Sequence, residues 1–208
     1  MLTPKTIRKS LEEIVWTHLQ PRGFAIRRGF LIRERTPEIF DWIALPHSVP
    51  DKNGPAYFTA NIGIHVRPLH QLLERVGNEL SGYVPATFVV NVGYLTPDKR
   101  WIKWPFPRTE FSRTTAEALS QHIIQFGLPF QESFVNLKQV YAGCERHGIK
   151  EYNRLRLPIL GLLMGQKAQT IGALQQLLEE YRDVENAYAP HLRRSVGMLL
   201  EYLRTGAT

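Results

Sequence analysis

The sequence predicts an α+β protein, in which an antiparallel sheet of four to five strands is accompanied by an N-terminal helix and a helical C-terminal lobe. Three observations carry this prediction. The first segment has apolar residues at helical spacing, the stretch to about residue 105 alternates with a strand period, and the chain beyond residue 114 returns to helical spacing. Because mainly tight loops join the expected strands, an antiparallel meander is favoured over a parallel doubly wound sheet.

The N-terminal helix is expected over residues 3–19. Thr3 stands before Pro4, an order that suits an N-cap followed by proline at the first helical position. The segment of residues 20–23 contains proline and glycine and ends the helix. The apolar face is formed by Ile7, Leu11, Ile14, Val15 and Leu19.

Alternation and turn signals predict five strands, with a short helix over residues 67–76 between the third and the fourth. The turn Thr96-Pro97-Asp98-Lys99 is expected to join the last two strands as a hairpin. The expected strands cover residues 24–35, 39–45, 56–66, 87–95 and 100–105.

Beyond Thr114 the pattern is helical, and Thr114 with the later Glu117 resembles a capping box. We expect a sheet domain over residues 1–148 and a helical lobe over residues 149–208 that packs on it as one globular unit. The expected helices cover residues 114–126, 130–147, 155–165, 167–186 and 190–203.

Composition limits the classes of protein to consider. The lone cysteine, Cys144, can form neither an internal disulfide nor a thiolate zinc cluster, which fits a reducing cytoplasm. The longest apolar run covers residues 157–165, about half the roughly twenty residues that a membrane-spanning helix needs. We therefore expect a soluble, cytoplasmic protein without a membrane partner. The net charge of +7 favours nucleic acid, anionic lipid or an acidic protein as partner, and it is also typical of a surface adapted to solubility.

Two expected strands contain the same Asn-x-Gly pattern. Asn61 shares one strand face with Gly63, and Asn91 shares one with Gly93, because residues i and i+2 of a strand point to the same side. If the strands pair, two asparagines lie beside two positions without a side chain, which predicts a strip that admits a ligand or a partner's backbone. Alternatively, the glycines let a neighbouring group approach the sheet and the asparagines satisfy a bulge.

The segment of residues 94–106 interleaves aromatic and basic residues, a pattern typical of base stacking with phosphate contact or of a protein-binding surface. In the plainer alternative, Trp104 and Ile102 belong to the core, while Trp101 and Lys103 occupy a solvated face. With the two asparagines, the candidate binding residues of this segment are Tyr94, Lys99, Arg100, Trp101 and Lys103.

A third candidate is a row of arginines on one strand face, which suits an acidic partner. Carboxylates nearby make cross-strand ion pairs the plainer interpretation. The arginines of this row are Arg27, Arg33 and Arg35, with Arg28 beside them on the opposite face, and the carboxylates are Glu34, Glu38 and Asp41.

No residue pattern predicts catalysis, a metal or a cofactor. His65 and His70 are five residues apart, which does not match the spacing of a helical zinc-binding pair. Cys144 lies near His147 in an expected helix, but closeness in sequence does not make a catalytic dyad. Nucleophile-elbow and phosphate-binding glycine motifs are absent from the sequence.

The string Gly23-Phe24-Ala25-Ile26-Arg27-Arg28 after a helix, followed by an Asn-x-Gly strand, resembles an uncharacterised bacterial family of small α+β domains. Some members of that family are encoded near toxin–immunity loci. The resemblance covers roughly residues 5–145 and carries no catalytic residues over to this chain. It implies a small cytoplasmic α+β protein, and the helices after residue 150 lie outside it.

The leading hypothesis is a non-enzymatic protein-interaction protein, in an immunity-like form if the resemblance holds. Because the chain is basic, such a role requires an acidic partner. A nucleic-acid-associated protein is the first alternative, and steep weakening of binding by salt would distinguish it. An enzyme of unrecognised type is the second, and it requires a cleft in which titratable side chains converge.

Overall fold

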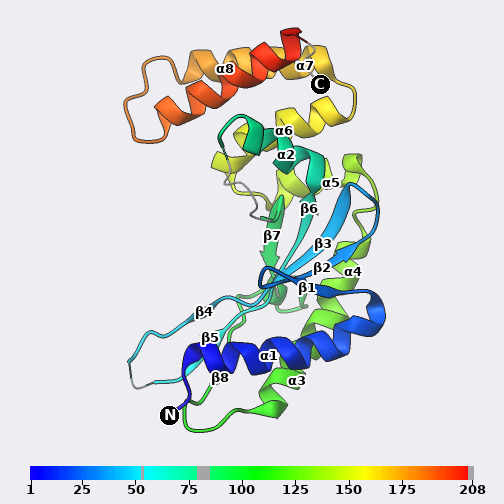
Figure 1. The fold of residues 1–208 in the computed structure, drawn as a ribbon, viewed down its shortest axis with the longest axis vertical. Helices are drawn as coiled ribbons and strands as arrows, with labels where there is room; N and C mark the ends of the chain where they lie inside the picture. Colours follow the sequence, from blue (N-terminus) through cyan, green and yellow to red (C-terminus); the bar gives the residue numbers. More distant parts are fainter. Residues whose placement is uncertain (53, 79–84, 206–208) are drawn as a thin grey trace. The chain divides into compact units, whose positions relative to one another are not determined.

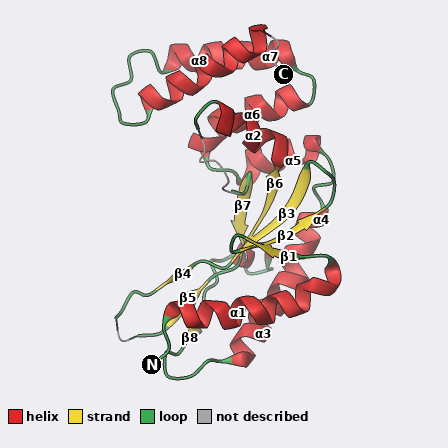
Figure 2. Cartoon of the chain, viewed as in Figure 1, coloured by secondary structure: helices red, strands yellow, loops and turns green. Residues whose placement is uncertain are grey.

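The computed structural model describes residues 1–52, 54–78 and 85–205. The predicted fold class is confirmed: Figure 1 and Figure 2 show an antiparallel sheet, an N-terminal helix and a helical C-terminal region. The chain divides into two compact units, each made of two segments. Unit 1 comprises Met1–Ile64 with Val89–Phe134, and unit 2 comprises His65–Phe88 with Val135–Thr208. The predicted boundary after residue 148 lies inside unit 2.

Unit 1 begins with the predicted helix, α1 (Pro4–Leu19). The hydroxyl of Thr3 accepts a hydrogen bond from the backbone N–H of Thr6, and Pro4 occupies the first helical position. A short 3-10 turn follows, η1 (Gln20–Arg22), and Gly23 ends it in the left-handed conformation at φ 85°. The fully buried face of α1 is formed by Ile7, Leu11, Val15 and Leu19.

The region predicted as one strand over residues 24–35 is a hairpin, so this prediction is wrong. Strands β1 (Ala25–Arg27) and β2 (Phe30–Glu34) pair antiparallel. Arg28 and Gly29 between them have φ of 53° and 81°. Positive φ at both central positions is the tight turn whose twist suits a two-residue hairpin.

The first sheet continues with β3 (Ile39–Ala44), which pairs antiparallel with β2. In the residues that the structure describes, this sheet has five strands in the order β1-β2-β3-β6-β7, where β6 is Asn61–Val66 and β7 is Phe88–Asn91. The first Asn-x-Gly string therefore lies within β6, and the second begins at the last residue of the neighbouring strand, β7.

A second sheet has the strand order β4-β5-β8, with antiparallel pairing throughout. It corrects two predictions. The expected strand over residues 56–66 is divided between the two sheets, and the expected hairpin of residues 87–105 does not form, because β8 pairs with β5 instead. The strands are β4 (His47–Ser48), β5 (Ala56–Phe58) and β8 (Trp104–Phe106).

The helices of unit 1 differ in their bounds from the predicted ones. The first begins after Ser112, whose hydroxyl accepts a hydrogen bond from the N–H of Thr115, so the expected cap at Thr114 is wrong. The expected helix over residues 130–147 is interrupted, because Asn136 caps a new helix. The elements are α3 (Arg113–His122), the π-turn η3 (Ile123–Gly127) and α4 (Leu128–Glu132).

The core of unit 1 joins the inner face of α1 to both sheets and to α3. Phe58 and Phe106 meet edge to face across β5 and β8, with ring centroids 5.3 Å apart. Trp104 is buried, as the plainer interpretation of the aromatic segment predicts. The sheet residues of this core include Leu31, Ile43, Ala56, Phe58, Ile62 and Phe106.

Unit 2 is mainly helical, and its described helices overlap the predicted ones, although the helix expected over residues 155–165 begins earlier, at Lys150. Gly165, in the left-handed conformation at φ 83°, separates two of these helices, and Pro158 lies inside one of them. No described helix is long and apolar enough to cross a membrane. The helices are α2 (Arg67–Arg75), α5 (Leu137–His147), α6 (Lys150–Leu163), α7 (Lys167–Glu180) and α8 (Ala189–Thr205).

Candidate functional site

Two exposed aromatic side chains meet in unit 1, after the end of β7. Tyr94 is 49% exposed and Trp101 is 55% exposed. Their ring centroids lie 6.2 Å apart with an angle of 70° between the planes, an edge-to-face contact. Large aromatic side chains that touch each other while remaining exposed form an apolar patch that a partner can cover.

The segment that carries this pair also holds three cationic side chains, those of Lys99, Arg100 and Lys103. The guanidinium of Arg100 lies 3.6 Å from the carboxylate of Asp98, and both side chains are exposed, so the ion pair is weak. The ammonium of Lys103 lies 4.3 Å from the centroid of the Tyr57 ring. We call Tyr94, Lys99, Arg100, Trp101 and Lys103 the aromatic platform.

Asn91 holds the platform loop at its two ends. Its Oδ1 accepts hydrogen bonds from the N–H of Gly93 at 2.9 Å and of Ile102 at 3.2 Å, and its Nδ2 donates to the carbonyl of Ile102 at 3.3 Å. A side-chain amide thus occupies both backbone groups of Ile102, as a neighbouring strand would. Asn91, which the sequence predicts to bind a ligand, is buried, and its side-chain amide forms its hydrogen bonds with the backbone of its own loop.

Gly93 permits the close approach of the loop's return segment. A Cβ at this position would lie 2.2 Å from the carbonyl oxygen of Arg100 and 2.8 Å from the nitrogen of Ile102. The turn (η2, Val92–Leu95) is closed by Thr96, whose hydroxyl donates to the carbonyl of Gly93 at 2.8 Å. Lys99 adopts a positive φ of 45° at the loop tip. The backbone that carries Tyr94 and Trp101 is therefore held by close packing and hydrogen bonds within the loop itself.

Asn61, the other predicted asparagine, has a different environment. Its Oδ1 is buried and has no hydrogen-bond partner among the described residues. The neighbouring Gly63 accepts a hydrogen bond from the side chain of Gln131, which also donates to the carbonyl of Trp42. The structure brings Tyr94, Arg100 and Trp101 onto one loop, whereas Asn61 lies in strand β6.

The predicted pairing of the arginine row is confirmed for two of its members. Asp41 is fully buried, and its carboxylate lies 2.6 Å from Nε of Arg33 and 2.8 Å from Nε of Arg35. Arg33 also lies over the ring of Phe24, at 4.9 Å from its centroid. These two arginines therefore serve the fold as partners of a buried charge.

The lone cysteine is held by hydrogen bonds in unit 2. The thiol of Cys144 donates to Oδ1 of Asn153 at 2.9 Å, and Nδ2 of Asn153 donates back to the carbonyl of Cys144 at 2.6 Å. Burial raises the pKa of Cys144 to about 12. The thiol is therefore protonated at neutral pH, in a state that is a poor nucleophile.

The sequence did not reveal a buried polar cluster at the start of α2. The rings of His65 and His70 stack with centroids 4.5 Å apart. Nε2 of His70 lies 3.0 Å from the hydroxyl of Thr87, whose carbonyl accepts a hydrogen bond from Arg156. Burial, and secondarily the charge of Arg156, lowers the pKa of His70 to about 3, so this ring is neutral near pH 7.

Periodicity does not indicate this cluster, because His65 is the next-to-last residue of β6 and His70 lies in the first turn of α2. Spacing rules apply within one element, so they cannot show that rings on two elements stack. In the part of the chain that the structure describes, no three side chains of His, Cys, Asp or Glu gather as metal ligands would.

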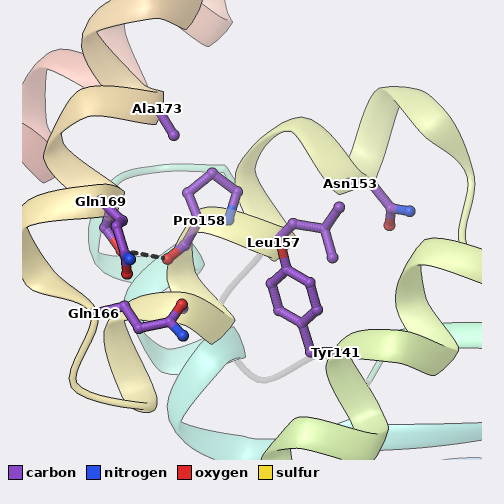
Figure 3. A pocket seen from close by; sticks show the side chains of 9 residues that line it. Tyr141, Asn153, Leu157, Pro158, Gln166, Gln169 and Ala173 are labelled. Atoms are coloured by element: carbon purple, nitrogen blue, oxygen red, sulfur yellow. Dashed lines mark hydrogen bonds between the residues drawn. The ribbon is translucent and has the colours of Figure 1, made fainter.

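A cavity of about 260 Å³ lies among α5, α6 and α7, and Figure 3 shows the side chains around it. Its described lining carries no charged side chain. The hydroxyl of Thr170 donates to the carbonyl of Pro158, and the amide of Asn153 is occupied by Cys144. Two exposed glutamines, Gln166 and Gln169, and the phenol of Tyr141 provide the remaining polar groups.

Comparisons of the chain with family models, with curated proteins and with solved structures found no match. The account of function therefore depends on the chemistry of these sites.

Proposed function

We propose that this chain is a non-enzymatic protein-binding protein whose contact surface is the aromatic platform and whose partner is acidic. The observation that carries the proposal is the exposed edge-to-face pair of Tyr94 and Trp101 on a loop held by Asn91. Tryptophan, tyrosine and arginine are the residues most enriched among those that dominate binding energy at protein interfaces.

The geometry favours a protein over nucleic acid. Single-stranded nucleic acid stacks its bases on open aromatic ring faces. In the platform, the two rings stand at 70° and cover part of each other. The fixed loop also lowers the entropy cost of binding, because little backbone has to be ordered on contact.

The charge of the platform supports an acidic partner. Three cations, Lys99, Arg100 and Lys103, stand beside one carboxylate, Asp98, on a chain with a net charge of +7. Complementary charge speeds association and excludes wrong partners. We place the interaction in the cytoplasm, and an immunity-like role is the narrower form of this proposal, in which the bound partner is an acidic toxin.

The test is photo-crosslinking in the native host, with benzoylphenylalanine in place of Tyr94. Tyr152, 52% exposed in unit 2, provides the matched control position. We expect a discrete protein adduct from position 94 that the additional change Trp101→Ala removes, and no such adduct from position 152. Lysates treated with nuclease should give the same adduct.

Two outcomes would refute the proposal. An adduct that disappears with nuclease treatment would show that nucleic acid is the ligand. Equal adducts from positions 94 and 152, or an adduct indifferent to Trp101→Ala, would show that the platform is an ordinary solvated surface.

A further inference from the structure

Unit 2 contains an apolar groove of about 270 Å³ that takes no part in the platform. Its walls come from three regions: α2, the end of α6 with the start of α7, and the end of α8. The described residues that line it are Leu72, Leu162, Leu163, Lys167, Tyr202 and Leu203. Leucine side chains make most of this lining, so the groove offers an apolar ligand a surface from which water is readily displaced.

The groove has a positive end. Lys167 is the only charged side chain among its described lining residues, and it is the first residue of α7. The N-cap of α7, Gln166, makes no side-chain capping bond, and the first turn holds no acidic residue. The unbonded amides and the dipole at a helix N-terminus favour an anion. A second cation lies beside another lining residue, since the guanidinium carbon of Arg75 lies 6.0 Å from the centroid of the Tyr202 ring.

We propose that this groove binds a free medium-chain fatty carboxylate. The leucines take the alkyl chain, while the carboxylate meets Lys167 at the start of α7. The volume of about 270 Å³ lies just below the range of about 300–1,000 Å³ that drug-sized ligands occupy, so it suits one short chain.

Charge separates this ligand from other occupants of an apolar groove. A second copy that docked the same groove about a two-fold axis would bring Lys167 and Arg75 near their own images. A purely apolar helix would bury the ammonium of Lys167 without a counter-charge, which is costly. A fatty carboxylate satisfies both the leucines and the lysine.

The test is calorimetric titration of the full chain with saturated carboxylates from hexanoate to dodecanoate, each below the concentration at which it aggregates. We expect affinity to rise about fourfold per added methylene until the groove is filled, and then to stop rising. Decylamine should bind at least about tenfold more weakly than decanoate, because its ammonium meets Lys167.

Paired lysine variants locate the site. Lys167→Gln should weaken decanoate binding about tenfold, as expected for loss of a charge-assisted hydrogen bond. Lys138→Gln removes an exposed lysine of α5 outside the groove and should leave binding unchanged. Leu163→Trp should abolish binding by filling the groove, and circular dichroism should confirm that each variant is folded.

Three results would overturn the proposal. These are equal affinity for decylamine and decanoate, unchanged binding by the folded Lys167→Gln variant, and a concentration-dependent dimer in sedimentation that Leu163→Trp abolishes while decanoate does not bind. The last result would assign the groove to a second copy of the chain.

Discussion

Two strings share the Asn-x-Gly pattern and begin in neighbouring strands, yet they have different structural roles. They are Asn61-Ile62-Gly63 and Asn91-Val92-Gly93. The first continues as strand β6, and its glycine carbonyl receives a hydrogen bond from Gln131. The second ends strand β7 and turns into a loop that its own asparagine clamps. The difference comes from the neighbours, since only the second string is met by a returning segment of chain.

The candidate site lies where Asn91 clamps its own loop. An asparagine that binds its own loop fixes the side chains which that loop carries, here Tyr94 and Trp101. The side-chain oxygen of Asn61 has no partner among the described residues, so this oxygen holds no loop in place. The two strings should therefore respond very differently to substitution.

The largest effect should come from Gly93→Ala. The added methyl would lie 2.2 Å from the backbone oxygen of Arg100, so the return segment has to move. We expect a loss of roughly 3 kcal/mol in the free energy of unfolding, measured by chemical denaturation. Gly172→Ala is the matched control, because a Cβ there meets nothing within 4 Å and alanine favours a helix. Equal stability of the two variants would contradict the packing described here.

Asn91→Ala should cause the next largest loss in the free energy of unfolding, about 2–3 kcal/mol. The substitution leaves the N–H groups of Gly93 and Ile102 without their acceptor. Asn91→Asp keeps that acceptor and should recover part of the loss. Denaturant titrations of the wild type, Asn91→Ala and Asn91→Asp measure the order of their free energies of unfolding. An aspartate variant less stable than the alanine variant would mean that burying a carboxylate beside the carbonyl of Ile102 costs more than the retained acceptor contributes.

Gln131→Ala should lower the free energy of unfolding by less than Asn91→Ala does, about 1–2 kcal/mol. It removes the donor to the carbonyls of Trp42 and Gly63, and a carbonyl without its partner is tolerated better than a buried N–H. The same titration measures it. A loss greater than that of Asn91→Ala would reverse the ranking of the two strings.

Asn61→Ala should change the free energy of unfolding by no more than about 0.5–1 kcal/mol. The substitution removes a buried oxygen that has no partner among the described residues, so little is lost. Thermal denaturation of Asn61→Ala and Asn91→Ala under the same conditions compares their stabilities. A destabilisation as large as that of Asn91→Ala would show that both asparagines act alike.

Local signals made part of the fold predictable. The helix over residues 3–19 was correct in bounds and cap because Thr3, Pro4 and the apolar spacing all act within one element. The hairpin of residues 87–105 was wrong because β8 pairs with β5, which lies far earlier in the chain. Sequence alternation shows that a strand forms but not which strand it joins.

The candidate site was likewise predictable only in part from the sequence. Aromatic and basic residues between positions 94 and 103 were visible as a composition, and the structure places Tyr94 against Trp101. The role of Asn91 was not predictable, because its hydrogen bonds depend on where Ile102 returns. The stacking of His65 on His70 and the bond between Cys144 and Asn153 likewise join separate elements.

The most direct test of the central claim is the affinity of the crosslinked partner, once purified, for the wild-type chain, Trp101→Ala and Tyr152→Ala. Trp101 is exposed, so its removal should change stability by less than about 0.5 kcal/mol. The platform predicts that Trp101→Ala weakens binding at least about 30-fold, whereas Tyr152→Ala leaves it unchanged. Equal affinity of the wild type and Trp101→Ala would contradict the account.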